Sequence, residues 1–138
     1  MAAALVADAS VAAAWCFPDE RTDFTDAVLE ALTSGSVEVL VPHLWAYEVR
    51  NSVLMGVRRG RISVAHAEGF LDSLRDLPVR LAEPPSYEDI FALANEHGLT
   101  FYDAAYLELV LRQGLPLASL DNKLLKAAME SGATLFQP

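Results

Sequence analysis

Two patterns of apolar residues alternate along this chain: short uninterrupted runs, and longer stretches in which apolar side chains recur every three or four positions. The short runs predict buried strands, and the amphipathic stretches predict helices. Strands are expected at residues 5–7, 37–41, 79–82, 115–120 and 133–136. Helices are expected at residues 11–17, 22–33, 43–59, 102–112 and 122–131, between Ser63 and Pro78, and between Ser86 and Gly98.

Residues that begin or stop helices support this division. A serine oxygen accepts a hydrogen bond from the free N–H groups of the first turn, so we expect N-caps at Ser10, Ser63 and Ser86. Pro18 and Pro78 stop the helices that precede them, because proline has no N–H to continue the helix. Strands and helices therefore alternate throughout the chain.

Such alternation is typical of an α/β domain, and we expect a parallel central sheet of about four or five strands with helices on both faces. With 138 residues, 53% of them hydrophobic, the chain can bury one core, so residues 1–138 are expected to form a single domain. It has no run of the roughly 18 or more apolar residues that a membrane span needs. No basic residues precede Asp8, as they would in a signal peptide, and we expect a cytoplasmic protein.

Two aspartates follow directly after predicted strands. Asp8 ends the first strand, and Asp121 comes after the strand at residues 115–120. In open parallel sheets, binding sites form outside the carboxyl ends of the strands. Asp8 and Asp121 are therefore predicted to lie on the same edge of the sheet.

Two further acids occupy unusual positions in helices. Asp103 begins a helix among aromatic residues and alanines, and a carboxylate that faces a core needs a metal ion or hydrogen-bond partners. Glu48 borders the apolar stripe of the helix at residues 43–59, and Asn51 lies about one turn further on the same side. Both acids are candidates for the site that Asp8 and Asp121 predict.

Each acid also has a simpler explanation. Asp8, Asp103 and Asp121 stand at helix starts, where a carboxylate caps the helix or complements its dipole, and Glu48 could pair with an arginine in solvent. The combination favours a site, because the four can converge above the sheet. Carboxylate oxygens suit Mg²⁺, or alternatively Mn²⁺, and a zinc site lacks the histidine and cysteine spacing that it requires.

Four short motifs, taken together and in order, resemble the PIN-domain endonucleases, and most closely the VapC-type toxins of bacterial toxin–antitoxin pairs. The motifs span nearly the whole chain. They are Asp8-Ala9-Ser10, Glu48 with Asn51 three residues later, Tyr102-Asp103-Ala104-Ala105-Tyr106, and Ser119-Leu120-Asp121 before a helix that begins with Lys123 and Leu124.

The resemblance implies a single PIN-like domain that acts as a Mg²⁺-dependent endoribonuclease, hydrolysing RNA phosphodiester bonds through a metal-activated water. It implies that Asp8, Glu48, Asp103 and Asp121 are both the catalytic and the metal-binding residues. Ser10 and Ser119 match hydroxyl positions that support these acids, and Asn51 and Asn122 are further candidates for a supporting role. Some family members carry an acid where Asn122 stands, which leaves open whether one or two ions bind. The implied partners are RNA, an antitoxin whose tail covers the active site, and a second copy of the chain in a homodimer.

The formal charge of −9 is unusual for a protein that binds nucleic acid. Acidic residues number 19 and basic residues 10, so acids remain in excess even when the four candidates are set aside. Contact with RNA must therefore be local and partly carried by metal. Arg58, Arg59 and Arg61 form the one basic cluster, which could hold an RNA backbone or merely complement a helix C-terminus.

Two other classes of function remain as alternatives. Receiver domains and haloacid-dehalogenase-like phosphatases also use an aspartate after the first strand. However, the phosphatases need a second aspartate where Ser10 stands, and receivers need a phosphoacceptor aspartate at the end of a central strand. A catalytically silent PIN fold that binds RNA or protein is the non-enzymatic alternative. It predicts the loss of an acid, whereas all four are present.

Overall fold

The computed structural model describes residues 3–138 and is built on a four-stranded parallel sheet with the strand order β3-β2-β1-β4. Its strands are β1 (Ala3–Ala7), β2 (Val37–Val41), β3 (Val79–Leu81) and β4 (Leu117–Ala118). In the register, Leu5 pairs with Val39 of β2 and Val6 with Leu117 of β4. The first strand therefore lies in the interior of the sheet, with neighbours on both sides.

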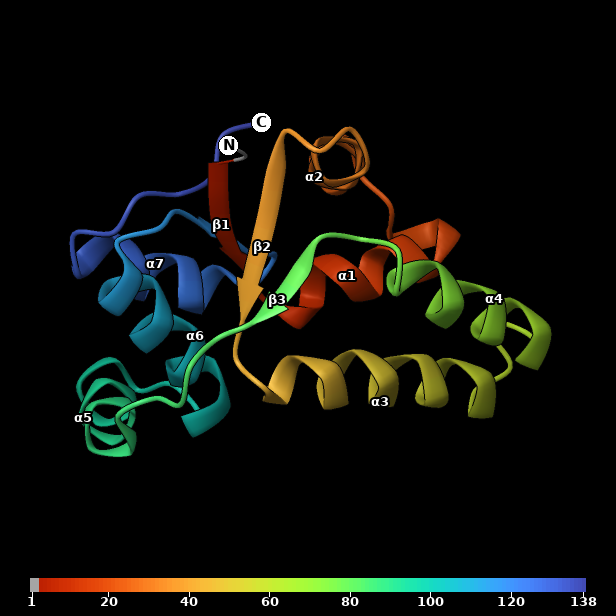
Figure 1. Cartoon of the computed structure of the whole chain (residues 1–138). Helices are drawn as coiled ribbons and strands as arrows, with labels where there is room; N and C mark the ends of the chain where they lie inside the picture. Colours follow the sequence, from red (N-terminus) through yellow and green to blue (C-terminus); the bar gives the residue numbers. More distant parts are fainter. Residues whose placement is uncertain (1–2) are drawn as a thin grey trace.

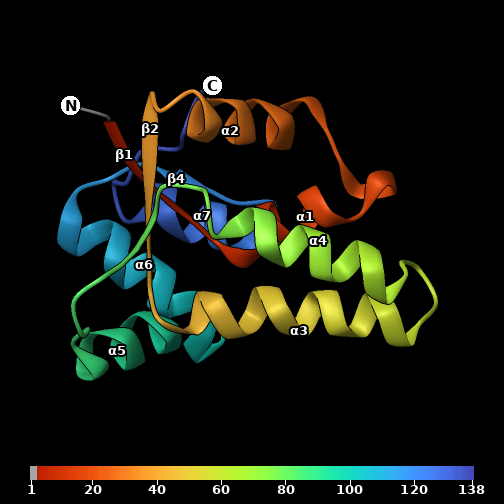
Figure 2. The same cartoon turned by 45° about the vertical axis from the view of Figure 1, so that its right-hand side comes forward.

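Within residues 3–138, seven α-helices cover the two faces of this sheet. Four of them, α1 to α4, lie on one side, and α5 to α7 lie on the other (Figure 1). Figure 2 shows α3 and α4 side by side and antiparallel. The bounds of the helices are α1 (Ala9–Cys16), α2 (Asp23–Thr33), α3 (Leu44–Arg58), α4 (Val64–Leu74), α5 (Tyr87–His97), α6 (Phe101–Gln113) and α7 (Asn122–Glu130). A short 3-10 turn, η1 (Pro18–Glu20), follows α1. The predicted α/β class with helices on both faces is confirmed.

The strand order creates a switch point between β1 and β4. From β1 the chain proceeds through α1 and α2 to β2, and through α3 and α4 to β3. It then returns through α5 and α6 on the opposite face, and β4 pairs with the other side of β1. Parallel sheets bind ligands at such points, outside the carboxyl ends of the strands. Asp8 and Asp121 lie immediately beyond these ends.

The predicted elements agree with the structure except near the C-terminus and at one cap. The strand expected at residues 115–120 is reduced to the two residues of β4. The strand expected at residues 133–136 is wrong, because only an isolated bridge joins Leu135 to Leu117, and so short a β4 gives a fifth strand little to pair with. The N-cap of α1 is Asp8, not Ser10, since the helix begins directly after the strand.

The core forms between the sheet and helices on both of its faces. No helix within residues 3–138 has both the length and the apolar character needed to cross a membrane. The helix α6 has a long buried middle section, which makes it a rigid support for whatever its first turn carries. Its buried residues run without a break: Ala104, Ala105, Tyr106, Leu107, Glu108, Leu109 and Val110.

A close contact between Gly56 of α3 and the ring of Phe17 fixes how α3 lies against the end of α1. A Cβ atom at position 56 would overlap the Phe17 ring, coming within 2.5 Å of its Cζ atom. Gly56 is buried and Phe17 is almost fully buried, so a Cβ at position 56 would force the packed Phe17 ring to shift. This contact sets how closely α3 approaches α1, and with it the position of Glu48.

We expect Gly56→Ala to destabilise the protein by about 1–3 kcal/mol, because overpacking outweighs the roughly 1 kcal/mol that alanine contributes to a helix interior. Urea unfolding measures this difference. Gly69→Ala is the matched control: Gly69 also lies inside a helix, but a Cβ there meets nothing within 4 Å. That variant should gain about 0.5–1 kcal/mol. Equal stabilisation by both substitutions would contradict the packing argument.

Candidate active site

All four predicted acids line one hollow. Asp8, Glu48, Asp103 and Asp121 surround a space of about 320 Å³ together with Ala9, Ser10, Asn51, Ser52 and Tyr106. The acids come from four different elements: the end of β1, the helix α3, the helix α6 and the start of α7. No lysine or arginine is among the residues that line the hollow.

Asp8 is the most deeply buried of the four, with 4% of its surface exposed. It caps α1 by accepting hydrogen bonds at Oδ1 from the backbone N–H and the hydroxyl of Ser10. Its other oxygen, Oδ2, accepts a hydrogen bond of 2.6 Å from the hydroxyl of Ser119. Both carboxylate oxygens are therefore held, and the side chain cannot rotate without breaking these bonds.

The two serines also tie the segment after β4 to the start of α1. The hydroxyl of Ser10 accepts a hydrogen bond from the backbone N–H of Leu120 at 3.0 Å. The hydroxyl of Ser119 accepts one from the backbone N–H of Asp121 at 2.9 Å. Each serine therefore serves the Asp8 carboxylate and the chain that leads into α7, so the structure places Asp8 and Asp121 on a common frame.

Asp121 and Asp103 are placed by their helices. Asp121 caps α7, where its Oδ1 accepts hydrogen bonds from the backbone N–H groups of Lys123 and Leu124. Asp103 lies in the first turn of α6, whose cap is Thr100, and its backbone N–H donates to the Thr100 hydroxyl. Capping thus explains the local positions of both acids, and their carboxylates are brought together above the sheet.

Glu48 reaches the hollow from α3. Trp45, Val49 and Val53 form the buried face of that helix, and Glu48 is half-buried beside it. Its Oε1 accepts a hydrogen bond of 2.6 Å from the hydroxyl of Tyr106, a residue of α6. The bond joins helices from opposite faces of the sheet.

The four carboxylates repel one another and are partly desolvated. Burial raises the pKa of Asp8, Glu48 and Asp103 above the ordinary values of these groups. Neighbouring acids raise these pKa values further: Asp103 acts on Asp8 and on Glu48, and Asp121 acts on Asp103. Hydrogen bonds from the serines and from Tyr106 oppose the shifts at Asp8 and Glu48. A cation in the hollow would relieve both the repulsion and the desolvation.

The donor set consists of oxygen atoms, the kind of ligand that Mg²⁺ and Mn²⁺ prefer. Within residues 3–138, no group of three or more acid, histidine or cysteine side chains is close enough to enclose a metal ion directly. Mg²⁺ commonly keeps several of its waters and takes only one or two carboxylates. At about 30 Å³ per water, the hollow has room for such a hydrated ion beside a phosphate group.

The remaining candidate residues divide into those near the hollow and those away from it. Asn51 lines the hollow, whereas Asn122, on the first turn of α7, lines a different surface depression with Leu125 and Phe136. Arg59 and Arg61 line a neighbouring hollow that also contains Asn51 and Ser52. The two hollows share these residues and so adjoin each other.

The three arginines are not equivalent. Arg61 donates to both Asp19 and Glu20, at 3.0 and 2.6 Å, and its guanidinium lies 4.1 Å from the ring centre of Phe17. Arg58 and Arg59 are exposed and form no ion pair within the described residues 3–138. The cluster seen in the sequence is thus reduced to two free cations.

Tyr106 is the site residue to which the sequence assigned no role. It belongs to the motif around Asp103, and its spacing of three residues from that acid places the two on one face of α6. Burial and the contact with Glu48 raise its pKa, so the hydroxyl remains a donor at neutral pH. The helical spacing was the available indication, but the partner on α3 is 58 positions away.

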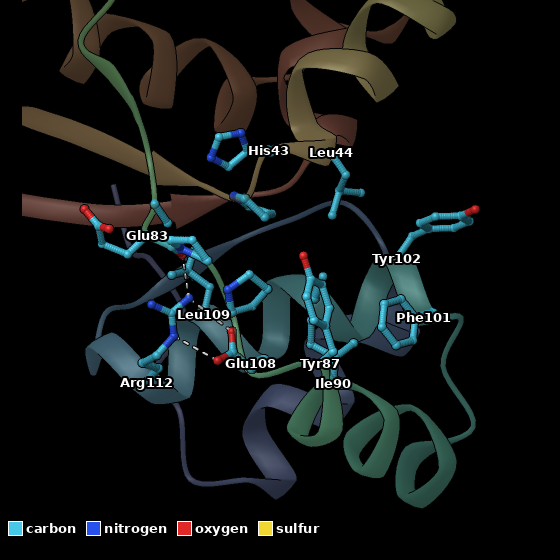
Figure 3. A pocket seen from close by; sticks show the side chains of 15 residues that line it. His43, Leu44, Glu83, Tyr87, Ile90, Phe101, Tyr102, Glu108, Leu109 and Arg112 are labelled. Atoms are coloured by element: carbon cyan, nitrogen blue, oxygen red, sulfur yellow. Dashed lines mark hydrogen bonds and ion pairs between the residues drawn. The ribbon is translucent and has the colours of Figure 1, made fainter.

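Another hollow lies beside the start of α6, on the side away from the four acids, between that helix, α5 and the beginning of α3. Figure 3 shows Tyr87, Phe101 and Tyr102 around one end of it and the ion pair of Glu108 with Arg112, of 2.8 Å, at the other. It is lined mainly by apolar and aromatic side chains and holds none of the four acids. Its chemistry is that of a contact surface, not of a catalytic centre.

Comparisons with known proteins agree with this geometry. A family model described as PIN domain matches residues 5–129. Ribonuclease VapC3 of Pyrobaculum aerophilum is 37% identical over 124 residues, which cover 87% of this chain and 91% of that protein. Exonuclease VapC9 of the same organism is 33% identical over 88 residues, or 64% of this chain and 65% of that protein.

Solved structures show the same fold. The crystal structure of PAE2754 from Pyrobaculum aerophilum has a TM-score of 0.71 and 28% sequence identity, and the match covers 92% of this chain and 86% of that one. Mycobacterium tuberculosis VapC20, described as a sarcin-ricin loop cleaving toxin, has a TM-score of 0.66 at 15% identity, covering 97% and 99% of the two chains. The family model matches most of this chain, which therefore belongs to the PIN-domain family and, by its identity with Ribonuclease VapC3, to the VapC group within it.

Proposed function

We propose that this protein is a Mg²⁺-dependent endoribonuclease, the toxin of a toxin–antitoxin pair, and that it cleaves RNA at the hollow lined by the four acids. The observation that carries the proposal is the convergence of Asp8, Glu48, Asp103 and Asp121 from four separate elements onto one space without a basic residue. A carboxylate cluster of this kind needs a cation. The names of the two VapC relatives, a ribonuclease and an exonuclease, support nuclease chemistry.

In this proposal the four acids bind one or two Mg²⁺ ions, with Mn²⁺ as a substitute. The bound metal would supply a water of lowered pKa and would polarise the scissile phosphate. The protein holds the acids in place: Ser10 and Ser119 fix Asp8, and the cap of α7 fixes Asp121. No side chain of the hollow has to act as a nucleophile.

Incubation of the protein with a pool of RNAs and Mg²⁺ should produce new internal ends, mapped by sequencing. Asp103→Asn removes a charge at nearly constant shape and should lower the rate at least 100-fold, since electrostatic groups at a reacting centre contribute on this scale. Omission of metal should have the same effect. If the RNA is shortened only from its ends, the activity is that of an exonuclease and not of an endonuclease. Undiminished metal-dependent cleavage by Asp103→Asn would show that this acid is not part of the mechanism.

When no metal is bound, the charged carboxylates should also lower the free energy of unfolding. A carboxyl whose pKa is higher in the folded protein holds its proton more tightly there. Its contribution to stability is therefore greatest at low pH. That contribution is lost as the pH rises from the pKa of the unfolded state, 3.8 for aspartate, through the raised pKa of the folded state. In EDTA, Asp103→Asn should thus become more stable relative to the unsubstituted protein as pH rises through this window, reaching on the order of 1 kcal/mol, or several degrees in Tm, at neutral pH.

Asp89→Asn is the matched control for this stability measurement. Asp89 occupies the same position in the first turn of α5 as Asp103 in α6, and its N–H likewise donates to the cap hydroxyl. It is exposed, so its charge only complements the helix dipole, and its loss should cost about 0.3–1 kcal/mol. Opposite signs for the two substitutions are expected, and a loss of stability in both would contradict the proposed repulsion.

We propose that RNA leaves the acidic hollow along α3, past Asn51 and Ser52, toward Arg59 with Arg58 beside it. The two adjoining hollows form a continuous path of this kind, and Arg59 is free to accept a phosphate. Arg61, which sequence spacing grouped with these two, is already neutralised by Asp19 and Glu20 and is assigned to holding the path in shape.

Arg59→Gln should reduce the slope of log K for RNA binding against log salt by about 0.7, the value for one phosphate of a single strand. Arg61→Gln serves as the comparison, because its charge is compensated within the protein and its removal should leave the slope nearly unchanged. Binding of a short uncleavable RNA to catalytically inactive protein, titrated at several salt concentrations, gives both slopes. An equal reduction in the two variants would refute the distinction between these arginines.

We further propose two protein partners. A second copy of this chain would cover the aromatic face shown in Figure 3, where Tyr87 and Tyr102 are each 63% exposed and where Glu108 and Arg112 neutralise each other. Exposed apolar patches of this kind mark protein interfaces. Light scattering, which gives the mass in solution, tests the homodimer.

An antitoxin tail that covers the active site should be basic, because it faces four carboxylates. Co-purification of such a tail with the protein tests this partner, and the tail should no longer co-purify when its basic residues are neutralised.

A further inference from the structure

Tyr106 stands apart as the aromatic residue among those that line the acidic hollow. Only 1% of its surface is exposed, yet its hydroxyl lies at the hollow and donates to Glu48 Oε1 at 2.6 Å. One buried hydroxyl thus joins the helix α6 to the carboxylate on α3.

Glu48 depends on this bond more than Asp8 or Asp121 depends on any one contact. Asp8 is held by two serines, and Asp121 is held by the cap of its own helix. Glu48 has a longer side chain, and within residues 3–138 the Tyr106 hydroxyl is the only group that donates a hydrogen bond to it. Without Tyr106, the glutamate would be free to turn toward the solvent that reaches part of its surface.

We propose that Tyr106 is a positioning residue that fixes the Glu48 carboxylate, holding Oε1 and leaving Oε2 available to the metal. The proposal rests on the metal-dependent nuclease function proposed above. Tyr106 follows Asp103 by one turn of the same buried helix, so α6 supplies one acid directly and locates a second through the phenol. Groups that orient metal ligands in this way typically change metal affinity or activity by about 10–100-fold when they are removed.

The test is Mn²⁺ affinity, measured by calorimetry without RNA, for the unsubstituted protein and for Tyr106→Phe. The substitution keeps the ring in the core and removes only the hydroxyl, and water can reach Glu48, so the variant should remain folded. We expect Mn²⁺ to bind about 10–100-fold more weakly. In cleavage assays the Mn²⁺ concentration for half-maximal rate should rise by a similar factor, with kcat at saturating Mn²⁺ changed less. Tyr47→Phe, on the helix that carries Glu48 but exposed to solvent, should leave the affinity unchanged.

A second comparison separates positioning from a purely structural role. If Tyr106 acts through Glu48, then Tyr106→Phe should change Mn²⁺ affinity by less than about 3-fold when Glu48→Gln is already present, because coupled residues are not additive. An equally large loss in both backgrounds, or no loss in either, overturns the proposal while the nuclease function stands. An unsubstituted protein that binds no Mn²⁺ and cleaves no RNA overturns the proposed function, and this inference with it.

Discussion

The burial of the Asp8 carboxylate at the end of β1 is the constraint on which the rest of the site depends. A carboxylate with 4% exposure must find hydrogen-bond donors within the protein. Ser10 provides two of them from the first turn of α1, and Ser119 provides a third from a position 111 residues away. The same serines then accept from Leu120 and Asp121, so satisfying one acid also sets the path of the chain into α7.

The other acids are arranged around this fixed point by ordinary helix capping. Asp121 caps α7, and Asp103 lies in the capped first turn of α6. The competing explanations of these residues, as helix caps or as metal ligands, therefore do not exclude each other. A cap uses some of the lone pairs of a carboxylate and fixes its direction, and the remaining lone pairs face the hollow. Asp8 is both the cap of α1 and a wall of the site.

The sequence predicted the parts of the fold and the site that local chemistry determines. The helix α5, from the cap at Ser86 to Gly98, follows from residues next to one another, and the placement of Asp8 and Asp121 follows from the rule for parallel strand ends. Contacts between distant segments could not be predicted in this way. The neutralisation of Arg61 depends on Asp19 and Glu20, more than 40 positions earlier, and the loss of the last strand depends on the shortness of β4. Tyr106 was visible as a motif residue, but its partner on α3 was not.

The structure also explains how a chain with an excess of acidic residues can present positive charge beside the site. Six of the ten lysines and arginines pair with acids: Arg21, Arg61, Arg75, Arg80, Arg112 and Lys126. Arg59, which forms no ion pair within residues 3–138, lines a hollow that adjoins the acidic one, so positive charge is available beside the site. Net charge describes the average surface, whereas binding depends on the few groups along one path.

Glu48 is the acid whose position is least determined by its own neighbourhood. Asp8, Asp103 and Asp121 sit at the starts of α1, α6 and α7, and their own helix ends place them. Glu48 lies in the interior of α3, a helix that reaches the site from the other face of the sheet. Its location depends on the packing of Gly56 against Phe17 and on the hydroxyl of Tyr106. Because both contacts join segments far apart in the sequence, small changes in packing would alter the distance between this acid and the other three.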